Sequence, residues 1–168
     1  YTENSRSTSA PLLHGDNLYF TSSGGICARK QATGELVWKT PFANAGYQNP
    51  IPVVWEDQLL VNGINFRSLD LATGKVLWQV NCGREADRFL RSRRQAIGGS
   101  STPLIAGDHA FFGHDDTSLR AVDRSGQLKW EYRVGTPIKT APTASGNMVF
   151  AHDFAGNLWC FVGTNSGP

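Results

Sequence analysis

A motif of ten or eleven residues that closes on tryptophan occurs three times in the chain, and this recurrence constrains the fold more than any other feature. Its clearest copy is Ser68–Trp78, where an apolar run, an aspartate and a glycine turn lead into a second apolar run. The other copies are Ala28–Trp38 and Ala121–Trp130. Each copy predicts a strand, a tight turn and a second strand. An internal repeat of this kind must be interpreted before any single residue.

A proline precedes each copy at a nearly constant distance. The separations are 27 residues from Pro11 to Trp38, 26 from Pro52 to Trp78 and 27 from Pro103 to Trp130. A fourth unit begins at Pro142, and the same spacing would place its tryptophan at position 169, just beyond Pro168. We therefore expect the chain to be cut at the same point of the repeat at both of its ends.

The order of signals inside each unit predicts four short strands. The expected second strands are Leu18–Phe20, Leu59–Val61, Ala110–Phe112 and Met148–Phe150. The expected third strands are Ile26–Arg29, Phe66–Leu69, Leu119–Val122 and Leu158–Phe161. A repeat of ~40 residues with four strands is typical of a β-propeller blade. We expect an all-β, partial propeller of about four four-stranded antiparallel blades. It forms a single segment over residues 1–168, with blades at about 10–40, 51–80, 102–134 and 141–168, the last lacking its outer strand.

Composition and charge agree with this fold and exclude some partners. Eighteen glycines and eight prolines are spread along the 168 residues, and no segment has the long apolar periodicity of a helix. A net charge of +2 does not predict a nucleic-acid-binding surface. No apolar run reaches the roughly 20 residues of a membrane-spanning helix. Because the chain begins at Tyr1 rather than at Met, we expect a processed or excised segment.

The three cysteines, Cys27, Cys82 and Cys160, have neither zinc-site spacing nor the pattern of a disulfide framework. We predict no disulfide. Cys160 occupies the repeat position of Ala28, Ser68 and Ala121, so we expect a small packed residue there.

Each tryptophan of the motif is expected to wedge between neighbouring blades, since its ring offers roughly 150–250 Å² of surface for burial where two twisted sheets diverge. The motif resembles the Ala-x-Asp-x-x-Thr-Gly-x-x-x-Trp motif of the quinoprotein-like (PQQ-like) repeat propellers, although Lys30 replaces the aspartate in the first copy. The expected blade-docking residues are Trp38, Trp78, Trp130, Gly34, Gly74, Gly126, Asp70 and Asp123.

The resemblance implies a complete ring of more than four blades, commonly seven or eight. A half ring would expose two apolar blade faces, which a soluble monomer does not normally carry. We expect these faces to be covered either by remaining propeller blades or by a second copy of the chain. A closed ring of four blades is a less favoured alternative.

Polar residues at the turn between the second and third strands are candidate ligand-binding residues. They are Asn62, His114, Asp115, His152 and Asp153. Such turns lie on one face of a propeller near its channel, so these side chains could converge on a ligand or a metal. We favour the alternative that they are ordinary turn formers, and we predict no metal site and no catalytic residue.

An insertion between Trp78 and Pro103 carries further candidates, namely Arg84, Arg88, Arg91, Arg93 and Arg94. Residues 88–95 are expected to form a short helical turn in this loop. Arginine makes bidentate contacts with carboxylates and phosphates, so an acidic peptide, an acidic sugar or a neighbouring domain could bind here. A solvated loop is the favoured alternative.

The leading functional hypothesis is a non-catalytic scaffold that binds a protein, a glycan or an adjacent domain. Catalytic motifs such as a nucleophile elbow or a phosphate loop are absent from the sequence. The resemblance leaves two alternatives, a fragment of a quinone-dependent oxidoreductase that binds PQQ with calcium, or an accessory propeller of a larger hydrolase or kinase. It also implies a location in the periplasm or outside the cell. No cofactor is predicted under the leading hypothesis.

Overall fold

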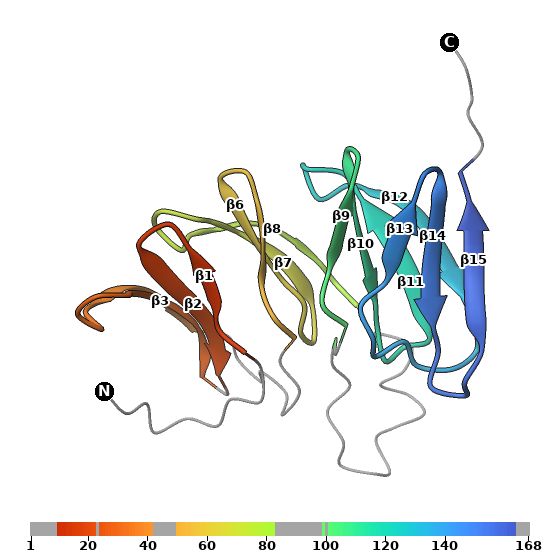
Figure 1. Ribbon diagram of the computed structural model, residues 1–168, viewed down its shortest axis with the longest axis horizontal. Helices are drawn as coiled ribbons and strands as arrows, with labels where there is room; N and C mark the ends of the chain where they lie inside the picture. Colours follow the sequence, from red (N-terminus) through yellow and green to blue (C-terminus); the bar gives the residue numbers. More distant parts are fainter. Residues whose placement is uncertain (1–9, 23, 42–49, 83–98, 100, 164–168) are drawn as a thin grey trace.

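The computed structural model describes residues 10–22, 24–41, 50–82, 99 and 101–163. All of its regular secondary structure is β-strand, and the strands form four antiparallel sheets in chain order (Figure 1). The sheets stand side by side and are called blades 1 to 4 below. The prediction of an all-β partial propeller of about four blades is confirmed.

Each blade is a meander in which consecutive strands pair. Blade 1 contains β1 (Leu12–His14), β2 (Asn17–Ser22), β3 (Gly25–Lys30) and β4 (Leu36–Pro41). Blade 2 contains β5 (Val53–Trp55), β6 (Gln58–Val61), β7 (Phe66–Asp70) and β8 (Val76–Val80). Blade 3 contains β9 (Leu104–Ala106), β10 (His109–Gly113), β11 (Ser118–Val122) and β12 (Leu128–Arg133). Blade 4 contains β13 (Thr143–Ser145), β14 (Met148–His152) and β15 (Leu158–Val162).

The first hairpin of every blade turns through one residue with a positive φ angle. Gly15, Gly107 and Gly146 have φ angles of 55°, 59° and 57°, and Glu56 has 56° at the same place in blade 2. Glycine adopts this conformation without a steric penalty, which explains its presence in three of the four turns.

Strand register places the motif tryptophans opposite small residues. Ala28 pairs with Trp38, Ser68 with Trp78 and Ala121 with Trp130, and a shift in register follows directly after each small residue. A bulge of this kind increases the local twist. It therefore changes the direction of the outer strand at the same point in each of these blades. The spacing seen in the sequence therefore corresponds to a repeated three-dimensional unit.

Three apolar clusters fill the spaces between consecutive blades. The first joins blades 1 and 2, the second joins blades 2 and 3, and the third joins blades 3 and 4. Alternation along each strand directs successive side chains to opposite neighbours. Phe66 of blade 2, for example, stacks on Phe112 of blade 3 with ring centroids 3.9 Å apart.

The prediction for Cys160 is wrong, because this residue is exposed. Its equivalents Ala28, Ser68 and Ala121 are buried beneath the next blade, whereas no further blade covers this face of β15 within the described residues. Cys27 and Cys82 are buried, and none of the three cysteines forms a disulfide in the structure.

Candidate functional site

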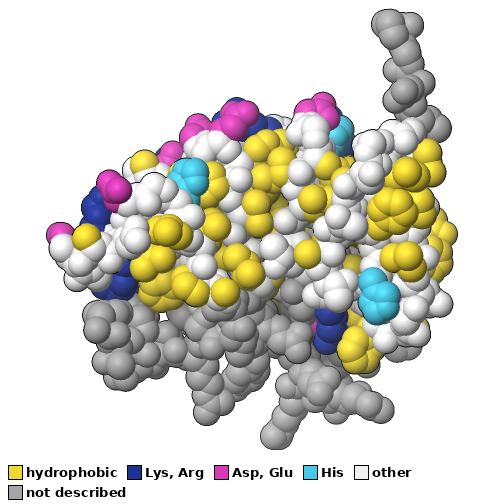
Figure 2. Space-filling model, viewed as in Figure 1, with side chains coloured by type: hydrophobic (Ala, Val, Ile, Leu, Met, Phe, Trp, Pro, Cys, Tyr) yellow, Lys and Arg dark blue, Asp and Glu magenta, His cyan; other side chains and the backbone are white. Residues whose placement is uncertain are grey.

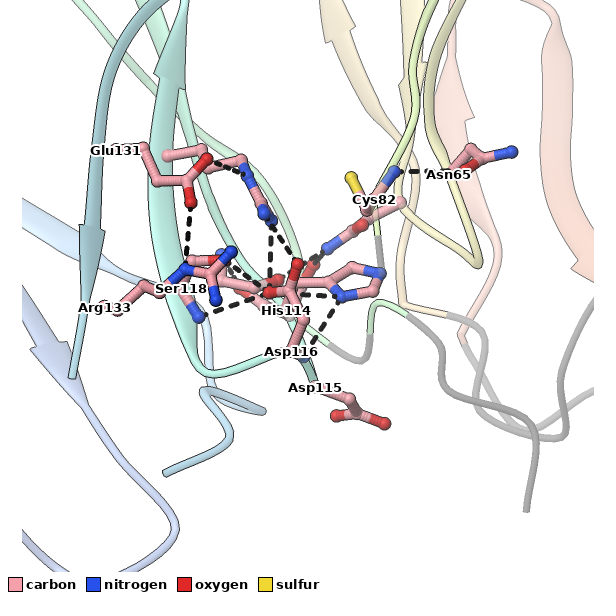
Figure 3. A network of polar contacts seen from close by, with 12 residues as sticks. Asn65, Cys82, His114, Asp115, Asp116, Ser118, Glu131 and Arg133 are labelled. Carbon is pink, nitrogen blue, oxygen red and sulfur yellow. Dashed lines mark hydrogen bonds and ion pairs between the residues drawn. The ribbon is translucent and has the colours of Figure 1, made fainter. Parts of the chain in front are cut away.

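The predicted ligand residue His114 lies fully buried between blades 2 and 3 (Figure 3). Its Nε2 is 3.1 Å from the carbonyl oxygen of Gly63. Since a carbonyl oxygen only accepts, Nε2 carries the hydrogen in this contact. On the other side of the ring, Nδ1 lies 3.3 Å from the backbone nitrogen of Asp116. Both ring nitrogens of His114 therefore make contacts with other groups of the protein.

A network of ion pairs surrounds this histidine at the turn between β10 and β11 (Figure 3). Asp116 accepts hydrogen bonds from Nη1 and Nη2 of Arg120 at 3.1 and 2.6 Å, and from the backbone and hydroxyl of Ser118. Arg120 also donates from Nε to Glu131 at 3.0 Å. The side chains of Asp116 and Arg120 are only 6% exposed. This bidentate pair fixes the turn against β11 and β12.

The pKa shifts of Asp116 and Cys82 bear on the chemistry of this network. Burial alone would raise the pKa of Asp116, but contacts with His114, Arg120 and Ser118 outweigh it and hold the pKa below its ordinary value. Burial raises the pKa of the nearby Cys82 thiol to about 11. The aspartate is therefore a buried anion with a matched cation, and the cysteine is a protonated thiol rather than a nucleophile.

Asn62 also joins blades 2 and 3. It is buried, and its Nδ2 donates to the carbonyl oxygens of Ser101 and Gly113 at 2.8 and 3.0 Å. A Cβ at Gly99 would overlap the Asn62 amide, so glycine is required where the chain passes this side chain. The amide therefore holds the segment that leads into blade 3.

Asp153 occupies the position in blade 4 that His114 occupies in blade 3. Its backbone nitrogen donates to Asn157 across the turn at 3.0 Å, as His114 does to Ser118. The Asp153 carboxylate is buried and accepts hydrogen bonds from Asn157 and from Nε1 of Trp159. Burial opposes ionisation here, but these hydrogen bonds outweigh it and lower the pKa of Asp153.

His114 and His152 each begin a His-Asp pair, but the two histidines do not occupy equivalent positions in their blades. Strand register makes His152 the equivalent of Gly113, and His152 is exposed. Asp115 lies in the turn of blade 3, with its carboxylate 3.9 Å from Lys139. Within the described part of the chain, no group of three or more His, Cys, Asp or Glu side chains could hold a metal ion. The hypothesis of a shared ligand site gains no support.

The arginine-rich insertion lies outside the described residues, together with its expected helical turn. The ligand-binding role of Arg84, Arg88, Arg91, Arg93 and Arg94 stays a prediction.

Two of the three motif tryptophans, Trp38 and Trp78, contact the glycine turn of the next blade. Nε1 of Trp38 donates to the carbonyl of Leu71 at 3.1 Å, and Nε1 of Trp78 donates to that of Arg124 at 2.9 Å. The rings cover Gly74 and Gly126, where a Cβ would come 2.5 Å from Cδ2 of the covering ring. Trp130 packs edge-on against Phe161 of blade 4, with centroids 4.8 Å apart. At Gly34 of blade 1, by contrast, a Cβ would meet nothing within 4 Å.

The motif aspartates shape these turns. Asp70 accepts hydrogen bonds from the backbone and hydroxyl of Thr73, and these bonds lower its pKa. Asp123 accepts from Ser125 in the same way and also pairs with Lys129 at 3.0 Å. The hydrogen bonds from Ser125 and Lys129 lower the pKa of Asp123. Each carboxylate thus stabilises the loop that receives a tryptophan.

The comparisons with known proteins agree with this geometry. Residues 62–167 match the family model described as outer membrane protein assembly factor BamB. The chain belongs to the BamB family. A BamB relative from Salmonella typhimurium is 28% identical over 122 residues, which cover 68% of this chain and 30% of the relative.

Solved structures show the same fold. BamB from Moraxella catarrhalis superposes with a TM-score of 0.76 at 22% identity, over 96% of this chain and 48% of that protein. The computationally designed Ika4 protein superposes with a TM-score of 0.70 at 14% identity, over 96% of this chain and 93% of that protein. Quinohemoprotein alcohol dehydrogenase from Comamonas testosteroni superposes with a TM-score of 0.73 at 14% identity, over 89% of this chain and 29% of that protein. The predicted resemblance to quinoprotein-like propellers is confirmed, and the chain spans about half of the Moraxella BamB structure.

The described residues do not fit the quinone and calcium that the resemblance suggested as an alternative. They contain no carboxylate-rich group that could hold a metal ion, and no two of the three cysteines are adjacent in the chain. No chemical step is therefore derived through a quinone. The oxidoreductase and accessory-domain alternatives stay predictions.

The network of Asp116, Arg120 and Glu131 was not predicted from the sequence. Its one signal in the sequence is an aspartate four residues before an arginine, a spacing that suggests a pair on a helix rather than across a turn and a strand. Glu131 lies on a separate strand, so its contact with Arg120 depends on the pairing of β11 with β12.

Proposed function

We propose that this chain forms part of a non-catalytic, protein-binding scaffold that takes part in outer-membrane protein assembly. The match of residues 62–167 to the BamB family model carries this proposal. A propeller presents its loops on a rigid frame, which suits a role in holding other proteins together.

The use of the buried polar groups supports the same conclusion. His114, Asn62 and Asp116 form contacts inside or between blades, and their buried side chains are not available to a small substrate. We therefore expect partners to bind at the loops, at the arginine-rich insertion and at the outer faces of blades 1 and 4. We expect further propeller blades to cover the two outer faces, because the chain spans about half of the Moraxella BamB structure.

The proposed location is the outer membrane, as the name of the family suggests, on the periplasmic side that the resemblance to quinoprotein-like propellers implies. In the ranges that the structure describes, no helix is long and apolar enough to cross a membrane. The partner is expected to be a protein that presents an acidic surface to the arginine-rich insertion.

Complementation tests the proposal. The polypeptide that carries this chain is expressed in a bacterium that lacks its own BamB, and the amounts of its outer-membrane proteins are measured. We expect restoration of these amounts, and we expect Arg88→Glu combined with Arg91→Glu to reduce it. The matched control is Lys30→Glu, because Lys30 is exposed and the other two copies carry aspartate at this position. Lack of restoration by a folded, exported polypeptide would reject the proposal.

A further inference from the structure

Asn62 is the one asparagine of the chain that is followed by a glycine. An Asn-Gly pair forms a five-membered succinimide ring readily, because the glycine nitrogen approaches the asparagine side chain without obstruction by a side chain of its own. The nitrogen of Gly63 bonds to Cγ of Asn62, the Cγ–Nδ2 bond breaks, and ammonia leaves with the proton of the Gly63 N–H group. Water then opens the ring to aspartate or isoaspartate. The reaction therefore needs no partner other than water.

In the folded protein both residues of this pair are held by hydrogen bonds between blades 2 and 3. Nδ2 of Asn62 donates to the carbonyl oxygens of Ser101 and Gly113 at 2.8 and 3.0 Å, which uses both hydrogens of the amide. The carbonyl oxygen of Gly63 lies 3.1 Å from Nε2 of His114. Asn62 is also only 1% exposed. Ring closure requires the amide to leave both carbonyl groups, so the closed interface keeps the pair unreactive.

The products of the reaction do not fit this closed interface. A carboxylate at position 62 has only acceptor atoms, and one of its oxygens would face the carbonyl oxygens of Ser101 and Gly113 in place of Nδ2. Within the described part of the chain, Oδ1 of Asn62 has no hydrogen-bond partner, so no donor on that side compensates a buried negative charge. Isoaspartate also adds a methylene group to the main chain. Either product therefore opposes native packing of blades 2 and 3.

The packing does not require glycine at position 63. Gly63 does not have a positive φ angle. Among the described residues, the nearest atom to a Cβ on Gly63 would be the carbonyl oxygen of Asn65, at 3.7 Å, which is an ordinary contact. Alanine is therefore compatible with the folded structure at this position. Gly63→Ala separates the chemistry of the pair from its packing.

We propose that Asn62–Gly63 is a deamidation site that the packing of blades 2 and 3 keeps unreactive. A molecule in which these blades separate releases the Asn62 amide, forms the succinimide and then aspartate or isoaspartate, and does not close again. Opening of the interface becomes irreversible with time, because the open state is modified chemically. This inference goes beyond the scaffold role and concerns the lifetime of the folded scaffold.

Ageing of the polypeptide that carries this chain, in mildly alkaline buffer, tests the reaction. One sample is kept folded and one is kept in guanidinium chloride, and mass spectrometry of the digested protein measures conversion of the Asn62 amide to a carboxyl group. Conversion should be at least about tenfold faster in the unfolded sample, since the folded protein reacts only after local opening. In the unfolded sample Gly63→Ala should slow the conversion by at least about tenfold, because its methyl group obstructs the attacking nitrogen.

Refolding of the aged samples tests the consequence for the fold. The refolded fraction, measured by near-ultraviolet circular dichroism, should fall in step with conversion at Asn62, and Gly63→Ala should keep its refolded fraction. Figure 2 shows hydrophobic side chains on the surface of the molecule, and such side chains favour aggregation during refolding. Because Gly63→Ala presents the same hydrophobic side chains, it is the control for losses by aggregation.

Asn62→Asp reproduces one product directly. It should lower the denaturant concentration at the midpoint of unfolding, because it places a carboxylate against two carbonyl oxygens. Asn147→Asp is the matched control, since Nδ2 of Asn147 also donates to a carbonyl oxygen, that of Gly163 at 3.0 Å, but Asn147 is exposed. This variant should keep a midpoint near that of the unaltered protein.

Three results would overturn the proposal. These are equal rates of conversion at Asn62 in the folded and unfolded samples, complete refolding of molecules that are modified at Asn62, and an unchanged unfolding midpoint for Asn62→Asp. Failure here is distinguishable from failure of the scaffold proposal, since the ageing and unfolding measurements involve no binding partner.

Discussion

The indole ring of Trp38 in blade 1 covers Gly74 in blade 2 so closely that a Cβ on Gly74 would lie 2.5 Å from Cδ2 of the ring. The indole nitrogen also donates a hydrogen bond to the turn that contains this glycine, through the carbonyl of Leu71. The contact therefore depends on a ring in one blade and on the absence of a side chain in the next.

Substitution of this glycine tests the contact. Gly74→Ala should lower the free energy of unfolding by about 1 kcal/mol for the positive φ angle, plus roughly 1–3 kcal/mol for the clash with the ring. Gly34→Ala is the matched control, because Gly34 has the same φ angle of 73° and open space around it. Denaturant unfolding measures both variants. Equal losses would show that the ring does not constrain Gly74.

A strained turn residue in blade 3 offers a stabilising substitution. Thr117 has a φ angle of 74°, where the equivalent residue of blade 4 is Gly156 with 91°. Thr117→Gly should raise the free energy of unfolding by about 1 kcal/mol, because a β-branched residue is disfavoured in this conformation. Gly156→Ala should lower it by a similar amount. A destabilised Thr117→Gly protein would contradict the account.

The ion pair between Asp116 and Arg120 predicts a pH dependence of stability. The pKa of Asp116 lies below its ordinary value in the folded protein, so its contribution is complete above the ordinary value of about 4 and is lost as the pH falls below it. Asp116→Asn should be less stable at pH 7, and its stability should fall less steeply between about pH 5 and 3.

Unfolding free energies at several pH values test this dependence. Asp16→Asn, which changes an exposed carboxylate in a turn of blade 1, is the control and should follow the pH profile of the unaltered protein. A profile for Asp116→Asn that runs parallel to that of the unaltered protein would contradict the assigned role.

The three cysteines should differ in reactivity. Cys160 is exposed, whereas Cys27 is buried and burial raises the pKa of Cys82 to about 11. Brief alkylation at pH 8 should therefore label Cys160 first, since the thiolate is the reactive form and Cys82 is almost entirely protonated. Mass spectrometry of the digested protein identifies the labelled residue. Labelling of Cys82 at the rate of Cys160 would show that blades 2 and 3 are not packed as described.

The fold could be predicted from the sequence because its strands repeat. The distance from Pro11 to Trp38 recurs to within one residue in two further units, and both Trp38 and Trp78 dock on the following blade. Register-dependent features were harder to predict. The His-Asp pairs that begin at His114 and His152 appear equivalent when only the sequence is compared. Strand pairing shows that their positions in the two blades differ by one residue.

The candidate site was less predictable, since its contacts join separate strands and blades. Arg120 reaches Glu131 only because β11 pairs with β12, and His114 contacts Gly63 only because two blades pack together. Cys160 is exposed for a related reason, because the packing of a repeat residue depends on the blade beside it.

The central proposal is that this polypeptide acts as a binding scaffold and not as a quinone enzyme. Thermal unfolding during titration with pyrroloquinoline quinone and calcium tests this claim most directly, with a quinone-dependent alcohol dehydrogenase in its apo form as the positive control. We expect the dehydrogenase to show a saturable rise in Tm and this protein to show none. A saturable, calcium-dependent rise in the Tm of this protein would contradict the account.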